Sequence, residues 1–452
     1  MEKPMENLLI DSKISRRQLL QYFGVVSASL TLPLSFTGCA VDPVSGGKQL
    51  MMVSRQQEIG IDRQHSPFQF SSDYGISQDK KINNYISQVG KTLVPNVHRL
   101  DMPYNFQCVN ATYINAYAFP GGSIAVTRGI LLKLDNEAQL AALLGHELGH
   151  INARHSSEQM SKSQLSSLLV SGLSIAAGTQ SEGLGKLTQQ LGMLGQGLLL
   201  SRYSRDNERE ADFLGNQYMV KSGFSTKGFV GLMEILQSLH EQQPSSTQIL
   251  FSTHPMSSER LAFAVKRQQG VYHSSITNTL NREKYMDSIA SLRDKKQGIE
   301  LLQQGEKYLG KKEYDNAQTS FKKSIQLLKQ DYTAHVLMSK CLMVMDKPMK
   351  ALSYANKAKK IYPKETQAIY IAGIANKELN NYDRAFNNFE QCDNILPGNP
   401  QIKFYKGYCL DNLNNKQVAA DNYMTYLKMI NYKSNKYSQY AYKRLQKWGY
   451  VN

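Results

Sequence analysis

The stretch HELGH, residues 146–150, decides the fold and the chemistry expected of this chain. It lies within a run rich in alanine and leucine, which predicts a long helix. Residues i and i+4 share one face of a helix, so His146 and His150 can reach the same metal ion. Glu147 falls within the apolar stripe of that helix, where a carboxylate without a task is costly. Beside a metal-bound water it would act as the general base.

Two imidazoles leave a tetrahedral zinc site incomplete, and the usual third ligand is another histidine or a carboxylate. Glu208 and Asp212 stand four residues apart on a second predicted helix. On their own these carboxylates would be interpreted as a solvated acidic face. Together with HELGH they predict that Glu208 is the third ligand of one zinc ion per chain. Asp212 would then fix the ring of a ligating histidine, and Glu210 points away from the site.

The segments around HELGH predict the rest of this domain. Residues 115–132 (NAYAFPGGSIAVTRGILL) are typical of a strand, a Pro-Gly-Gly turn and a second strand. Asp135 or Asn136 would cap the HELGH helix. Residues 178–197, rich in Gly, Gln and Leu, are predicted to be a loosely packed connection near the site.

The C-terminal third repeats itself every 34 residues. Each repeat has a small residue near its start, an alanine twelve residues later, and an aromatic or small residue four beyond that. The alanines are Ala317, Ala351, Ala385 and Ala419. Small residues at fixed positions let paired helices approach closely, and the aromatic ring fills the space between them. This pattern resembles the tetratricopeptide repeat, with four units and a final amphipathic helix that caps the stack.

Four motifs together resemble peptidase family M48, over most of residues 50–270. They are HELGH at 146–150, ExxAD at 208–212, NAYAFPGG at 115–122, and Thr-His-Pro at 253–255 with Arg260 following. The resemblance implies a zincin-like (gluzincin) fold and a zinc metalloendopeptidase.

The resemblance also implies further roles for individual residues. An edge strand would bind extended substrate as an additional strand, through Asn115, Ala116, Tyr117, Ala118 and Phe119. His254 would stabilise the oxyanion, or bind zinc as a fourth ligand and keep the enzyme latent, or be a structural histidine at a helix start. Arg260 would tie the site together. His155 is expected to face another direction.

The first forty residues are interpreted as an address. Arg16 and Arg17 resemble a twin-arginine export signal, and an apolar run follows. Residues 36–39 (FTGC) resemble a bacterial lipobox, in which Cys39 is lipidated and becomes the new N-terminus. A plain signal peptide or a short membrane anchor is the alternative. Ala40 after the cysteine favours the outer membrane as the destination.

The net charge of +16 is concentrated toward the C-terminus. It favours an acidic partner, a protein face or anionic lipid, although a solvated helical surface explains it as well. The sequence contains no aromatic-flanked basic motif, so nucleic acid is not an expected partner. Beyond Cys39 no apolar run reaches the ~18 residues of a membrane span. The other cysteines lack metal-site spacing and are expected to be buried, unpaired thiols: Cys108, Cys341, Cys392 and Cys409.

We therefore expect an α+β metallopeptidase domain followed by an α-helical solenoid. The predicted divisions are a signal peptide with lipobox (1–39), the peptidase domain (40–270), a linker (271–297), four repeats (298–433) and a capping helix (434–452).

The resemblance implies a periplasmic enzyme that degrades misfolded or misassembled envelope proteins. The lipobox-like residues 36–39 add the expectation that it is anchored to the outer membrane as a lipoprotein. The inner wall of the repeats is expected to hold a segment of substrate, or of the machinery that assembles outer-membrane proteins. The alternative function is a chaperone or assembly adaptor whose proteolytic activity is largely latent.

Overall fold

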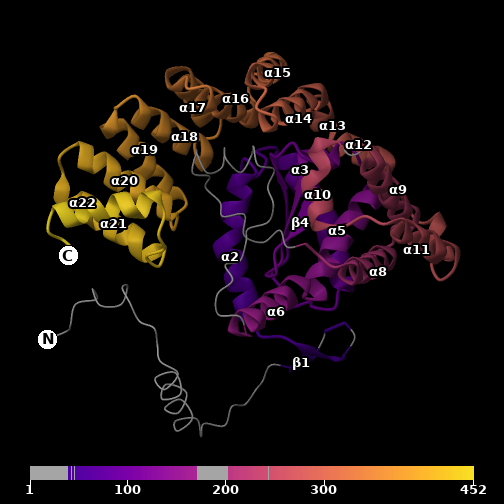
Figure 1. Cartoon of the computed structure of the whole chain (residues 1–452). Coiled ribbons are helices and arrows are strands. Elements are labelled where there is room, and N and C mark those ends of the chain that lie inside the picture. The colour runs from indigo at the N-terminus through magenta and orange to yellow at the C-terminus, as the bar shows by residue number, and fades with distance from the viewer. Residues whose placement is uncertain (1–38, 42, 45, 170–201, 243, 452) are drawn as a thin grey trace, which may run out of the picture.

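The computed structural model describes residues 39–41, 43–44, 46–169, 202–242 and 244–451. Residues 1–38 of the predicted signal segment and the Gly-rich stretch 178–197 lie outside these residues. An α+β unit carries the HELGH helix, and an arc of paired helices continues from it to the C-terminus (Figure 1). Among the described residues, no helix combines the length and the apolar character of a membrane span.

A three-stranded sheet has the order β3-β5-β4, with β4 at one edge. The strands are β3 (Asn105–Val109), β4 (Ala116–Ala118) and β5 (Ser123–Thr127). β3 runs parallel to β5 and β4 antiparallel to it. The predicted Pro-Gly-Gly turn joins β4 to β5, and Gly122 has a φ of 114° there, a conformation that favours glycine. A separate hairpin pairs β1 (Cys39–Val41) with β2 (Lys48–Leu50).

Helix α5 (Glu137–Asn152) carries HELGH through the centre of this unit, and all of its residues are buried. Asn136 caps it, since its side chain accepts a hydrogen bond of 2.9 Å from the Gln139 amide. The helices around it include α2 (Arg55–Ser72), α3 (Lys80–Leu93), α4 (Arg128–Leu131), α6 (His155–Leu169), α8 (Arg205–Lys221), α9 (Lys227–Gln242), α10 (Gln248–Thr253) and α11 (Ser258–Gln269). Short 3₁₀ helices are η2 (Val94–Asn96), η3 (Ser245–Thr247) and η4 (His273–Thr277).

Glycines let α8 lie directly against α5. A Cβ added at Gly215 would come within 2.6 Å of the backbone nitrogen of His146. One at Gly149 would come within 2.8 Å of the Ala211 carbonyl oxygen. The two backbones therefore touch, and the side chains of α5 and α8 beside the contact are brought within bonding distance.

The segment predicted to be a linker, residues 271–297, is mostly helical and packed. It contains α12 (Arg282–Ser288) and α13 (Ala290–Arg293). Tyr285 is fully buried, and its hydroxyl donates to the Leu131 carbonyl over 2.6 Å. A few large apolar side chains spaced along a polar stretch are enough to dock it, which explains why low apolar density suggested a linker.

Four helix pairs form the repeats: α14 (Lys296–Gly310) with α15 (Tyr314–Leu327), α16 (Tyr332–Val344) with α17 (Pro348–Ile361), α18 (Thr366–Glu378) with α19 (Tyr382–Ile395), and α20 (Pro400–Asn412) with α21 (Lys416–Met429). Helix α22 (Lys436–Lys447) covers the last pair. The turn inside each pair holds one residue of positive φ, again 34 residues apart: Lys312, Asp346, Asn380 and Asn414.

The small and aromatic residues of the repeat meet as predicted. A Cβ at Gly373 would lie 2.7 Å from the ring of Phe389, and one at Gly407 would lie 2.8 Å from that of Tyr423. In the second repeat Ser339 takes the glycine position, and its hydroxyl donates to the Ala351 carbonyl over 2.8 Å.

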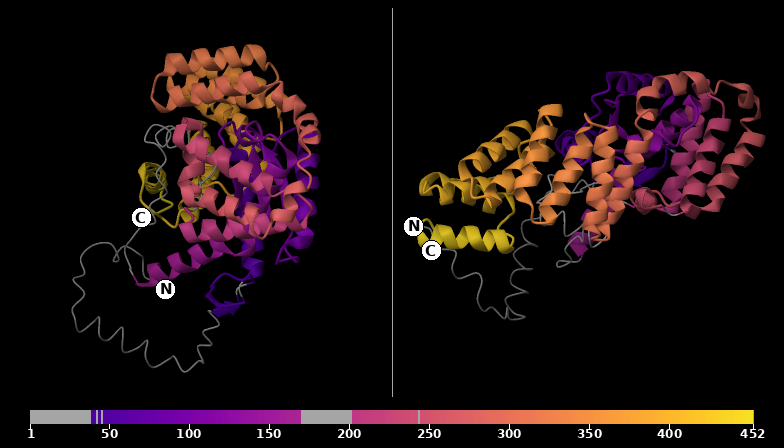
Figure 2. Two further views of the ribbon diagram at one scale, coloured as in Figure 1. Left: turned by 90° about the vertical axis from the view of Figure 1, so that its right-hand side faces the viewer. Right: turned by 90° about the horizontal axis from the view of Figure 1, so that it is seen from above.

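The inner helices of the first three repeats, α14, α16 and α18, lie against the peptidase unit (Figure 2). On α14, Glu306 accepts a hydrogen bond from Thr112. Asp331, at the start of α16, forms a buried ion pair with Arg128. On α18, the Gln367 amide donates to the Ser72 carbonyl over 3.0 Å. This contact surface, the seam, occupies part of the inner wall that was expected to receive another protein.

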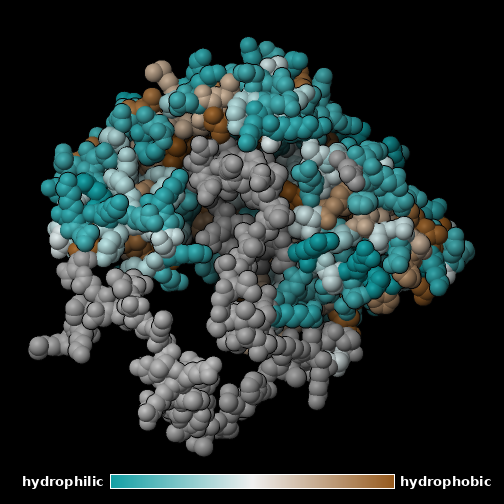
Figure 3. All heavy atoms as spheres, viewed as in Figure 1, coloured by the Kyte–Doolittle hydropathy of each residue, from teal (hydrophilic) through white to brown (hydrophobic). Residues whose placement is uncertain are grey.

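The outward face in Figure 3 is mostly hydrophilic over the repeats, with apolar residues scattered singly. All four cysteines after Cys39 are buried and free, as expected. Burial raises the pKa of the Cys409 thiol to about 12, so these thiols stay protonated and unreactive.

Candidate metal centre

Two imidazole nitrogens from α5 face one point. The Nε2 atoms of His146 and His150 are 3.0 Å apart, and both rings are buried. Adjacent turns of one helix place the rings side by side, as the spacing in HELGH predicts. Burial holds the pKa of His150 well below its usual range, so its ring is neutral and has a lone pair to offer.

Two further ligand atoms complete the cluster. Glu208, on the first turn of α8, has carboxylate oxygens 3.3 Å from His150 Nε2 and 3.6 Å from His146 Nε2. His254 follows the last residue of α10, and its Nδ1 lies 3.0 Å from Glu208 and 3.4 Å from His146 Nε2. Ligand atoms of the four residues all lie within 4.8 Å of one another.

This donor set fits zinc. Zinc takes four ligands at about 2.0–2.1 Å in a tetrahedron, which separates neighbouring ligand atoms by about 3.3 Å. The observed separations of 3.0 to 3.6 Å lie around that value. Two ring nitrogens only 3.0 Å apart also need a positive centre or a shared proton between them, because their lone pairs repel.

Glu147 lies beside the cluster, with one carboxylate oxygen 4.0 Å from His254 Nε2. It is 1% exposed, and its other oxygen has no hydrogen-bond partner among the described residues. Burial raises the pKa of this carboxyl, and the nearby rings of His254 and His146 partly offset that effect. A buried carboxylate with a free oxygen and a raised pKa is suited to accepting a proton.

Asp212 and Arg260 contact the ligand residues and fix their positions through ion pairs and hydrogen bonds. Asp212 lies one turn beyond Glu208, with a carboxylate oxygen 2.9 Å from His146 Nδ1. Arg260 grips both oxygens of Asp212, at 2.7 and 2.8 Å, and lies 2.7 Å from Glu208. Burial alone would raise the pKa of Asp212, but the guanidinium outweighs it and holds that pKa below its usual value. The same guanidinium, together with His254 and His146, holds the pKa of the Glu208 carboxyl well below its usual value, against the effect of burial.

His155 and Glu210 form a chain behind His150 that the sequence did not predict. His155 was expected to face another direction, yet its Nδ1 lies 2.9 Å from His150 Nδ1. Its Nε2 lies 3.1 Å from a carboxylate oxygen of Glu210, which was expected to point away from the site. If His150 donates to His155 and His155 donates to Glu210, the His150 Nε2 lone pair is left facing the cluster.

The backbone explains why helical spacing failed for His155. Arg154, between α5 and α6, has a φ of 59°, so the helix ends there and the chain changes direction, which leaves His155 against His150. No glycine marks this position, so the sequence gives no local signal for the turn.

The side chains of the predicted substrate strand are buried, except that of Ala118. Tyr117 donates to Asp73, and Tyr117 and Phe119 both pack into the apolar cluster of the seam. Ala118 is half-buried. Asn115 is fully buried, and neither polar atom of its side chain has a hydrogen-bond partner among the described residues.

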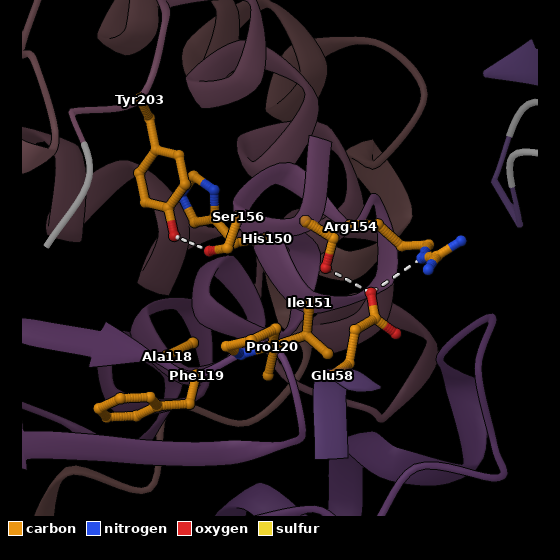
Figure 4. Close-up of a pocket in the computed structure, with 10 residues that line it drawn as sticks. Glu58, Ala118, Phe119, Pro120, His150, Ile151, Arg154, Ser156 and Tyr203 are labelled. Atoms are coloured by element: carbon orange, nitrogen blue, oxygen red, sulfur yellow. Dashed lines mark hydrogen bonds and ion pairs between the residues drawn. The ribbon is translucent and has the colours of Figure 1, made fainter. Parts of the chain in front are cut away.

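A narrow hollow connects this strand to the cluster (Figure 4). Ala118, Phe119 and Pro120 line one side, and His150 and Tyr203 line another. The Tyr203 ring stacks on His150 with centroids 3.8 Å apart. Glu58 closes the hollow and is held by Arg154 over 2.9 Å.

A histidine pair on one buried helix, a carboxylate from a second helix and a buried glutamate beside them define the HExxH class of metallopeptidase domain, here followed by a tetratricopeptide-like solenoid. Residues 80–268 match peptidase family M48. The metalloprotease YcaL of Escherichia coli is 33% identical over 190 residues, which cover 42% of this chain and 71% of YcaL. The chain belongs to peptidase family M48.

Other relatives match over the same region. The β-barrel assembly-enhancing protease of Escherichia coli is 31% identical over 197 residues, 42% of this chain and 40% of that protein. The chain therefore spans less than half the length of that relative. The mitochondrial metalloendopeptidase OMA1 of Schizosaccharomyces pombe is 32% identical over 229 residues, 50% of this chain and 65% of that protein. The TPR protein YrrB superposes with a TM-score of 0.31 at 14% identity, covering 46% of this chain and 97% of YrrB.

Proposed function

We propose that this protein is a zinc-dependent endopeptidase of the bacterial envelope that cleaves unfolded or misassembled outer-membrane proteins. One observation carries the proposal. Ligand atoms of His146, His150, Glu208 and His254 lie within 4.8 Å of one another, beside the buried carboxylate of Glu147. Zinc bound there would polarise the peptide carbonyl and lower the pKa of a water.

The residues around the cluster have separate tasks in this mechanism. His146, His150 and Glu208 would hold the zinc ion. Glu147 takes the proton of the attacking water through the oxygen that has no hydrogen-bond partner in the described part of the chain, and passes it to the leaving amine. Asp212 keeps the Nδ1 proton of His146 in place, so that Nε2 remains the ligand.

His254 has two candidate roles. Its Nδ1, 3.0 Å from Glu208, is close enough to join the ligand set and keep the enzyme latent. Alternatively, the ring moves aside and donates to the oxyanion. The variant His254→Ala separates them: activity on an unstructured peptide rises if the ring blocks the fourth position, and falls if it stabilises the oxyanion.

Substrate would bind as an extra strand along β4. An edge strand offers unpaired backbone groups, and the half-buried Ala118 is a small side chain on it. The amide of Asn115, buried and unpaired within the described ranges of the chain, would meet the substrate backbone. A buried amide left unpaired costs about 1–3 kcal/mol, which favours a ligand-binding task for it.

Location in the envelope rests on the N-terminal signal and on lipidation of Cys39. The relative named β-barrel assembly-enhancing protease supports a place near outer-membrane assembly. If Cys39 carries acyl chains, the protein partitions into detergent and incorporates a fatty-acid analogue, and Cys39→Ser abolishes both. A wild-type protein without acyl label would refute the anchor.

The second candidate function is an assembly adaptor with a dormant active site. The position of His254 within the ligand cluster favours it. Comparing wild type with Glu147→Gln in cells decides: an adaptor keeps its function without the base, whereas a protease loses it and its substrates accumulate.

Metal analysis tests the central proposal. Purified protein should contain about one zinc per chain. His146→Ala should lose the metal, whereas Glu147→Gln should keep it and lose activity, because Glu147 is no ligand. Glu259→Gln, an exposed carboxylate on α11, is the matched control and should change neither. Full zinc occupancy in Glu208→Ala would contradict the third ligand.

A further inference from the structure

A polar groove crosses the repeats away from the metal centre. It lies between α17 and α19, with α18 as its floor, and encloses about 280 Å³. Eight residues line it: Leu352, Asn356, Lys359, Asn376, Arg384, Asn387, Asn388 and Gln391. In Figure 1, α17 and α19 follow the outer rim of the arc, whereas α18 lies nearer the peptidase unit. The groove is therefore separate from the seam.

The groove floor carries an unsatisfied acceptor. Asn376 is 3% exposed, and its Nδ2 donates to the Ala372 carbonyl over 2.9 Å. Its Oδ1 has no hydrogen-bond partner among the described residues. Buried polar atoms in folded proteins are nearly always paired, so this oxygen is available to a donor that enters the groove.

Comparison with the neighbouring repeats shows that this asparagine is not needed for packing. The positions 34 residues before and after it are Leu342 and Leu410, both buried. Leucine therefore fits this position in two of the protein's own repeats. The third repeat replaces it with a polar residue only where the groove lies.

The groove lining carries two positively charged side chains, Lys359 and Arg384. None of the eight lining residues is acidic. Lys359 donates to the Asn388 side chain over 2.7 Å, and Asn388 in turn donates to the Arg384 carbonyl over 2.6 Å. These bonds hold the ammonium group at the wall, and Arg384 is exposed at the rim.

We infer that this groove binds an extended acidic segment of another protein. The ligand must offer both a hydrogen-bond donor, for Asn376 Oδ1, and negative charge, for Lys359 and Arg384. An extended acidic peptide has both, because main-chain N–H groups alternate with carboxylates along it. A helix, about 10 Å across, is too wide for 280 Å³. Leu352 provides an apolar contact for the carbon atoms of the peptide.

The inference rests on the proposed recruiting role of the repeats and gives it a location on the outer rim. Binding of an acidic segment to the groove requires neither a bound metal ion nor peptide cleavage. A binding measurement therefore separates it from the peptidase proposal: a chain that cleaves peptides without binding acidic segments overturns only the groove, and the reverse result overturns only the enzyme.

The test measures binding of a fluorescent, end-blocked hexaglutamate peptide to the full chain by anisotropy, with hexaglutamine for comparison. Arg384→Gln and Asn376→Leu should each weaken binding about ten-fold, since each removes a charged or buried hydrogen bond. Lys350→Gln is the matched control, because Lys350 is exposed and occupies the position of Arg384 in the preceding repeat. It should change affinity less than about two-fold.

Asn376→Leu is expected to fold, because Leu342 and Leu410 occupy the same position. Its melting temperature should equal or exceed that of wild type, since an unpaired amide is removed. Two results would overturn the inference. Equal weakening by Lys350→Gln and Arg384→Gln means diffuse attraction to a basic protein, and unchanged affinity in Asn376→Leu means that the groove floor is not used.

Discussion

The helix pairs α5–α8 and α18–α19 both approach closely through glycine, but what each glycine meets is different. At Gly215 an added Cβ would lie 2.6 Å from the backbone nitrogen of His146. At Gly373 it would lie 2.7 Å from the ring of Phe389. In the peptidase unit backbone touches backbone, whereas in the repeat a backbone touches a side chain.

The difference determines how much change each contact tolerates. A side chain can rotate or be replaced by a smaller one, as in the second repeat, where Ser339 and Ala355 replace the glycine and the aromatic residue. A backbone atom in the contact can do neither. The α5–α8 contact also sets the distance between His146 and Glu208, so a shift of one helix changes the metal centre itself.

Gly215→Ala should have the largest effect. The methyl group has no room, and overpacking of this kind costs up to about 3 kcal/mol, more than the roughly 1 kcal/mol that alanine gains over glycine in a helix. We expect a lower melting temperature and loss of zinc, measured by calorimetry and metal analysis. Unchanged stability with full zinc would show that the contact is not rigid.

Glu210→Gln tests the row of hydrogen-bonded side chains that joins Glu210 through His155 to His150. Groups that orient a metal ligand typically affect metal affinity about ten-fold or more, so zinc should bind about ten-fold more weakly while the fold is retained. Competition with a chelator measures this affinity. Glu259→Gln, exposed on α11, should leave it unchanged. Equal affinities in both variants would mean that His155 does not orient His150.

Gly373→Ala should have a smaller effect than Gly215→Ala, because only the Phe389 ring must move. We expect a net loss of about 1 kcal/mol or less in the free energy of unfolding. The double variant Gly373→Ala/Phe389→Leu should show favourable coupling, since a smaller side chain makes room for the methyl. Urea unfolding of the four proteins of the cycle measures it. Strict additivity would remove the contrast between the two contacts.

The helix caps should show the smallest difference between the two regions. Asn136 caps α5 and Asn399 caps α20, and each accepts a backbone hydrogen bond of 2.9 Å. Asn136→Ala and Asn399→Ala should each lower stability by about 1 kcal/mol. A much larger loss at Asn136, measured by thermal unfolding, would mean that the HELGH helix depends on its cap more than on its packing.

Local spacing accounts for the parts of the site that could be predicted. His146 and His150 are one turn apart, and so are Glu208 and Asp212, so each pair shares a helix face whatever surrounds it. Within each 34-residue repeat, the small and aromatic residues also have a fixed spacing, and this spacing predicts the paired helices. The position of His254 came only from resemblance to a family, because nothing in its neighbourhood ties it to α5.

Long-range contacts account for what could not be predicted. His155 reaches His150 only because Arg154 adopts a positive φ. The repeat pattern predicts which helices form the inner wall of the solenoid, but not which residues they contact. The seam with the peptidase unit could therefore not be predicted. Charged residues on the inner helices, such as the half-buried Glu306 and the buried Lys340, were the available hint. They pair with residues of the peptidase unit, since Glu306 bonds Thr112 and Lys340 lies over the Tyr74 ring.

The seam also divides the solenoid into parts of unequal local stability. One apolar cluster combines residues of the first two repeats and of α18, among them Leu302, Val336 and Ile371, with Tyr117 and Phe119 of the peptidase unit. The last repeat and α22 belong to another cluster, made only of repeat residues. A free solenoid unfolds by units from its ends, but here one end is fixed. Amide exchange should therefore be fastest from α20 onward, so that the chain frays from its C-terminus while its first repeats unfold cooperatively with the peptidase core.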